Sequence, residues 1–132
     1  SREAVGVVRR SHWIWSIAGL AAVLAGCSYV FDVEVIMTAE TVRFLPVDRS
    51  WNSPDCAKTV TVREAADHGA IVWKVGSIDG SCNLSFPVTY GVAPRNTPVE
   101  VTAKSLEIGK TYEVDILAEG SGYGETEFIY RP

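Results

Sequence analysis

The sequence predicts an all-β domain, a β-sandwich of seven or eight short strands, preceded by a helical leader peptide. Three observations lead to this fold class. Beyond residue 27, short runs rich in Val, Thr and aromatic residues alternate with polar side chains. Gly, Pro and Asp-Gly segments separate these runs at regular intervals. No stretch after the leader repeats apolar residues with the period of an amphipathic helix.

The first 26 residues have the order of features found in an export signal. Arg9 and Arg10 supply positive charge, and an apolar run over residues 13–24 follows them. A run of this length is too short for a comfortable transmembrane helix. We therefore expect residues 1–26 to be a signal peptide and residues 27–132 to form one exported domain, within the size range of a single core.

The apolar run closes on Leu24-Ala25-Gly26-Cys27, which resembles the lipobox of bacterial lipoprotein precursors. This resemblance implies cleavage before Cys27 and a diacylglycerol on its sulfur, which would anchor the domain in the cell envelope. Two or three acyl chains hold a protein on a membrane almost without release. Because Ser28 rather than Asp follows the cysteine, the outer membrane is favoured over the inner one. The alternative is an uncleaved anchor helix over residues 13–27.

Cys56 and Cys82 remain once Cys27 is assigned to lipid. An even number of cysteines in an exported chain predicts a disulfide, because such bonds persist outside the cytoplasm. The alternative is a reactive or metal-binding pair. A zinc site is disfavoured because His68 is the single histidine beyond the leader and the sequence has no C-x-x-C spacing.

The predicted strands of the first half follow in order. Residues 29–37 alternate as in a half-buried strand, with Asp32 and Glu34 on the polar face. Residues 41–47 form the next strand, and Pro46 marks its end or an edge. Residues 58–64 are rich in Val and Thr, and Asp67-His68-Gly69 forms a turn. The strand over residues 70–75 has one apolar face, made of Ile71, Trp73 and Val75.

The second half of the domain repeats this organisation. A turn at Asp79-Gly80 precedes a strand over residues 84–90, and residues 91–98, with two prolines, form a loop. Further strands are expected over residues 99–103, 111–118 and 125–130. Glycines separate the last three of these strands: Gly109, Gly120, Gly122 and Gly124.

Leu106-x-x-Gly109-Lys110-x-Tyr112-x-Val114 is similar to the segment that leads into the penultimate strand of fibronectin type III and related immunoglobulin-like domains. The resemblance implies an immunoglobulin-like sandwich with a tyrosine corner, in which the Tyr112 hydroxyl folds back onto nearby backbone. It also implies Leu106 in the core, a turn at Gly109 and a last hairpin at Gly122-Tyr123-Gly124-Glu125. A plain hairpin with a buried Tyr112 is the alternative.

The mature chain as a whole also resembles a group of small bacterial lipoproteins of uncharacterised function. The shared features are the cysteine pair and three short segments: Val72-Trp73-Lys74, Phe86-Pro87-x-x-Tyr90-Gly91 and Gly122-Tyr123-Gly124. This resemblance implies an envelope lipoprotein and supplies no activity.

Residues 27–132 contain 9 basic and 15 acidic residues, a net charge of −6. Nucleic acid is an unsuitable partner for such a domain, because phosphate binding depends on Lys and Arg. With no catalytic motif, cofactor motif or metal-ligand spacing in the sequence, we expect a non-enzymatic role in protein binding or envelope structure. The alternatives are an inhibitor of a hydrolase that attacks the envelope, such as lysozyme or a protease, and a carbohydrate-binding module.

Few side chains in the sequence are candidates for contact with a ligand or partner. Trp51, in a polar loop, and Tyr123, between two glycines, are expected to be exposed aromatic contacts for a partner or sugar, with loop packing as the alternative. His68 beside Asp67 has the chemistry of a general base, but its context favours a turn. The acidic pairs have the chemistry of a cation site or of an acid and base, but each is explained by a solvated strand face: Asp32 with Glu34, and Glu125 with Glu127.

Overall fold

The structure is a computed structural model that describes residues 28–47 and 53–132. Within these ranges the chain is all-β, which confirms the predicted fold class. The nine described strands are β1 Tyr29–Met37, β2 Val42–Pro46, β3 Cys56–Glu64, β4 Ile71–Gly76, β5 Leu84–Ser85, β6 Val88–Thr89, β7 Val99–Val101, β8 Thr111–Ala118 and β9 Gly122–Ile129, with short 3-10 turns η1 Ala66–His68 and η2 Glu119–Ser121. None of the described helical segments has the length and apolarity to span a bilayer.

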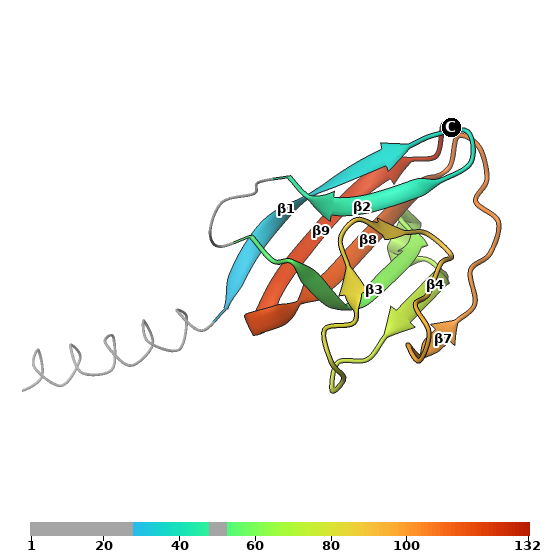
Figure 1. Ribbon diagram of the computed structural model, residues 1–132. Coiled ribbons are helices and arrows are strands. Elements are labelled where there is room, and N and C mark those ends of the chain that lie inside the picture. The colour runs from blue at the N-terminus through green and yellow to red at the C-terminus, as the bar shows by residue number, and fades with distance from the viewer. Residues whose placement is uncertain (1–27, 48–52) are drawn as a thin grey trace, which may run out of the picture.

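The strands form one curled, mixed sheet in the order β6-β2-β1-β9-β8-β3-β4-β7, and β5 pairs with the start of β3. β1 divides its pairing between two neighbours (Figure 1). Residues 29–32 run parallel to β9, whereas residues 33–37 pair with β2 in antiparallel register. β1 therefore joins the β2 side of the sandwich-like fold to the β9 side.

The core lies inside the curled sheet and is made of the inward side chains, which alternate with outward ones along the longer strands. Trp73 and Tyr112 are almost fully buried, and Trp73 packs edge-on against Tyr90 at a centroid distance of 5.1 Å. Phe44 packs against Phe128 at 5.7 Å. Burying one large apolar side chain stabilises a fold by roughly 1.5–3 kcal/mol, so this aromatic set accounts for much of the driving force.

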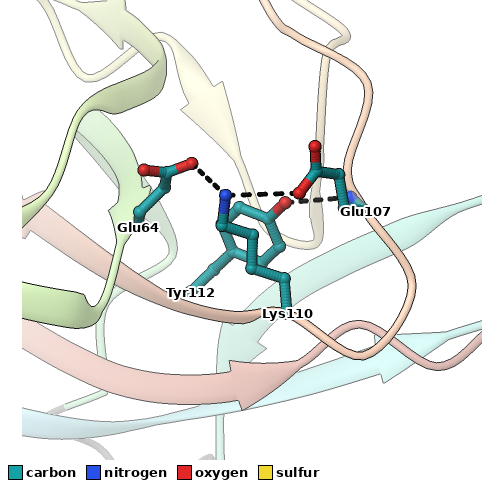
Figure 2. A network of polar contacts seen from close by, with 4 residues as sticks. All are labelled: Glu64, Glu107, Lys110 and Tyr112. Carbon is teal, nitrogen blue, oxygen red and sulfur yellow. Dashed lines mark hydrogen bonds and ion pairs between the residues drawn. The ribbon is translucent and has the colours of Figure 1, made fainter.

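The tyrosine corner predicted at Tyr112 is present at the start of β8 (Figure 2). The hydroxyl of Tyr112 accepts a hydrogen bond from the backbone N–H of Glu107, five residues upstream, at 2.9 Å. Leu106 packs against the core, and Gly109 makes the turn with φ +85°, a conformation that favours glycine. This bond holds the connection between β7 and β8 against the sheet.

Lys110 adds an ionic contact to the same corner (Figure 2). Its Nζ pairs with Glu64 at the end of β3 and, at 3.2 Å, with Glu107. Hydrogen bonds to these two carboxylates raise the pKa of Lys110. Because all three side chains meet water, the contact contributes little to stability, and its effect is to position the loop.

Two predicted strands differ from the observed ones. The strand predicted over residues 84–90 is divided at Phe86-Pro87, because proline has no N–H for a ladder. Its first part, β5, pairs with β3, and its second part, β6, pairs with β2. In β4, the register shifts opposite Val62, and Val72 becomes buried whereas Ile71 is only half-buried. The face predicted for Ile71 was therefore wrong.

The predicted last hairpin at Gly122-Tyr123-Gly124-Glu125 was also wrong. The chain reverses direction just before this segment, at η2, and Gly122 and Gly124 belong to β9. In the parallel register, Tyr29 faces Gly122 and Phe31 faces Gly124. A Cβ on Gly124 would lie 2.6 Å from Cε2 of Phe31, so only glycine leaves room for the aromatic rings of β1.

Candidate functional site: an acidic sheet face

The structure confirms some of the site residues predicted from the sequence and does not describe others. Cys56 and Cys82 form the predicted disulfide, with their Cα atoms 5.6 Å apart. Cys27, the predicted signal peptide over residues 1–26 and Trp51 lie outside the described residues. His68 ends η1, in the region predicted as a turn. Tyr123, predicted in a loop, lies on β9 and is 37% exposed.

Tyr123 belongs to a strongly acidic face formed by β1, β8 and β9. Residues that alternate with the core positions point away from it on each strand. We define the acidic face as the carboxylates that this alternation and the strand register bring together: Asp32, Glu113, Asp115, Glu125 and Glu127. Glu34 is exposed two residues further along β1, where the strand has left β9 and pairs with β2.

The register sets like charges opposite one another. Glu113 faces Glu127, and Asp115 faces Glu125 across the β8–β9 pair. Asp32 faces Glu125 across the β1–β9 pair. Like charges in such positions destabilise a sheet, typically by a few tenths of a kcal/mol or more for each pair. The arrangement therefore has a cost that folding alone does not explain.

The centre of the acidic face is organised by Tyr123 and Arg63. The hydroxyl of Tyr123 donates to Oε2 of Glu125 at 2.8 Å and is 3.1 Å from Oδ1 of Asp115. Arg63 on β3 pairs with Asp115 at 3.5 Å. Among the described residues, Arg63 thus offsets part of the negative charge from the β3 side.

Partial burial, together with Asp115 and Glu125, raises the pKa of Glu113 above its usual value of 4.5, and Arg63 opposes this shift. Desolvation and the hydrogen bond to Glu125 raise the pKa of Tyr123 as well, so its hydroxyl keeps its proton. In both cases burial is the largest cause, and the neighbouring carboxylates add to it. The face consequently favours bound protons or a bound cationic group.

Three of these carboxylates, on Glu113, Asp115 and Glu125, offer oxygens within 4.8 Å of one another. Oxygen ligands suit a hard cation such as Ca²⁺, but that ion takes six to eight of them. Exposed acidic groups also cluster without binding metal, and we assign no ion to these three. The other such group consists of Cys56, Cys82 and Glu119, and both of its sulfurs are committed to the disulfide.

A hollow of about 260 Å³ lies between the end of β2 and the Phe86-Pro87 segment. Its described lining contains Ser53 and Asp55 but no histidine, lysine or cysteine. Those groups do not complete the nucleophile, base and orienting set of acyl transfer. The acidic face is therefore the more informative candidate site.

Sequence reasoning missed Glu113 and Asp115 as members of this site. The pattern Thr111-Tyr112-Glu113-Val114-Asp115 did show two outward carboxylates on a strand, the same signal as Glu125 and Glu127. The sequence pattern does not contain the register that places β8 beside β9 and so brings these carboxylates together.

No protein-family model matches the chain, and a search of curated proteins finds no match for it either.

Proposed function

We propose that this protein is a membrane-anchored lipoprotein whose β domain binds another protein of the cell envelope, without catalysis of its own. The lipobox at Cys27 and the residue Ser28 support attachment to the outer membrane, facing the periplasm. The Cys56–Cys82 disulfide agrees with an exported domain, because such bonds persist outside the cytoplasm.

The acidic face carries the proposal of protein binding. Its carboxylates repel one another across two strand pairs, and a surface with Lys or Arg side chains would relieve that repulsion. Charge complementarity of this kind speeds association and excludes partners of like charge. Tyr123 adds a rigid aromatic side chain with a polar tip, a residue type enriched at binding hot spots. The partner is thus a protein with a basic surface.

A neutralising variant tests this assignment. Glu113→Gln/Glu125→Gln/Glu127→Gln removes three charges from the acidic face and retains the size of the side chains. Wild-type protein, extracted from envelopes in detergent, should retain a basic partner that elutes with salt, because exposed charge pairs are screened. The variant should lose that partner.

The matched control removes three charges elsewhere. Glu40, Asp67 and Asp79 are exposed and lie in turns, so Glu40→Gln/Asp67→Asn/Asp79→Asn makes the same change in net charge. It should bind the partner like wild type. Equal loss from both variants would show a general charge effect, and recovery of no partner by the wild type would count against protein binding altogether.

Inhibition of a basic, envelope-attacking hydrolase is the second candidate, and the acidic face favours it specifically. An acidic surface suits the rim of a basic enzyme. Inhibition of one member of a panel of lysozymes and proteases by the wild type, but not by the neutralised variant, would select it. Sugar binding through Tyr123 is less well supported, because its hydroxyl is already engaged by the carboxylates of Glu125 and Asp115.

A further inference from the structure

The start of β1 is fastened to the body of the domain from its first residue. Tyr29 lies over Gly122, where an added Cβ would be 2.6 Å from the Tyr29 hydroxyl. That hydroxyl donates to the carbonyl of Glu119 at 2.7 Å. Phe31 makes the next contact, over Gly124, and packs against Phe86 at 6.3 Å. These contacts hold the beginning of β1 in place from Tyr29 onward.

Ser28 alone separates Cys27 from Tyr29 in the sequence. Two consecutive Cα–Cα steps span at most about 7.6 Å. A lipid-bearing Cys27 must lie at the headgroup level of the bilayer, since its acyl chains are in the hydrocarbon. The beginning of β1 is then held within roughly 10 Å of the headgroups.

Several other segments lie at the same end of the sheet. β9 leaves this end beside β1, and β8 and β4 arrive at it, so η2 and the loop after β4 are found there (Figure 1). Two exposed apolar side chains lie near this membrane-facing end: Val30, which is 79% exposed on the same side of the sheet as its partner Tyr123, and Ile78, which is 64% exposed in the loop after β4. Glu119 and Asp79 are exposed at the same end, and their charges oppose entry of this end into the hydrocarbon.

We propose that the anchored domain rests on the bilayer through this membrane-facing end, with its strands directed away from the membrane. The inference rests on the lipid attachment in the proposed function. β1 has nine residues and spans roughly 30 Å, so the opposite end, with Ile108, stands well clear of the lipid. The acidic face then lies along the side of the domain, open to a partner in the periplasm rather than turned to the headgroups.

Two matched positions test this orientation in the full lipidated protein. Ile78 and Ile108 are both highly exposed, at 64% and 79%, and lie at opposite ends of the sheet. Ile78→Cys and Ile108→Cys each introduce one reactive thiol, because Cys56 and Cys82 are bonded and Cys27 would be alkylated. Each variant is labelled with a small fluorophore and reconstituted into phosphatidylcholine vesicles that contain headgroup spin-labelled lipid, a short-range quencher.

The label at position 78 should be quenched at least twofold more than the label at position 108. Equal quenching, or stronger quenching at 108, overturns the orientation. Mass spectrometry of the same sample separates this failure from failure of the proposed function: lipid on Cys27 with equal quenching refutes the orientation alone, whereas an unmodified Cys27 refutes both.

Discussion

Tyr112→Phe isolates the hydroxyl of the tyrosine corner. Tyr112 is 2% exposed, and its hydroxyl is the acceptor for the N–H of Glu107 at 2.9 Å. Removing the hydroxyl leaves a part-buried donor without this acceptor, which costs about 1–3 kcal/mol. The ring and its contact with Phe128 stay in place, so the change isolates one hydrogen bond.

That loss corresponds to a fall in Tm of roughly 5–20 °C for a domain of about 100 residues. Thermal unfolding followed by circular dichroism, with the disulfide intact, measures it. Tyr123→Phe is the control, because its hydroxyl bonds to carboxylates that water also reaches; its effect should stay within about 0.5 kcal/mol. A Tm for Tyr112→Phe within 2 °C of wild type would refute the argument that this bond holds the corner.

Three further predictions concern charge, packing and the disulfide. The pKa of Glu113 is raised in the folded state, so the stability that its protonation contributes is complete below its unfolded pKa and is lost as pH rises through the raised folded pKa. At pH 7, Glu113→Gln should therefore be more stable than wild type by about 0.5 kcal/mol. Urea titrations should show this difference disappear as pH falls toward 4.5. Gly122→Ala should destabilise the domain by roughly 1–3 kcal/mol in wild type but by much less in a Tyr29→Ala background, because the added Cβ collides with the Tyr29 ring. Additive effects of the two substitutions in this double-mutant cycle would contradict the ring contact. Cys56 and Cys82 are 26 residues apart in the sequence, so reducing their disulfide should lower the free energy of unfolding by roughly 3.5 kcal/mol. This loss is measured as a lower denaturation midpoint in dithiothreitol. An unchanged midpoint would show that the bond does not constrain the unfolded chain.

The local features of the fold were predictable because their causes are local. Alternation of apolar and polar residues has a period of two in any strand, and it identified β1 and β8 with their bounds. The tyrosine corner also depends on neighbours within six residues, from Leu106 to Tyr112. Cysteine parity predicted the disulfide without any knowledge of distance.

The acidic face was predictable only in part. Asp32 and Glu125 were recognised as outward carboxylates on separate strands, and the alternation of β8 contained the signal for Asp115. Their meeting on one face depends on a parallel β1–β9 pairing between segments more than 90 residues apart. No pattern within one strand specifies which strand becomes its neighbour.

The sequence by itself determined the strand alternation, the acidic balance and the disulfide partners. The membrane anchor stays a proposal that rests on the resemblance of Leu24-Ala25-Gly26-Cys27 to a lipobox. The tertiary structure alone decided where the glycines of the Gly-Tyr-Gly motif belong. The resemblance carried by Leu106 to Val114 implied a last hairpin at Gly122-Tyr123-Gly124-Glu125. Both glycines instead lie within β9, where the rings of Tyr29 and Phe31 occupy the space that side chains would fill. A requirement imposed by residues so distant in sequence appears only when the two strands are packed together.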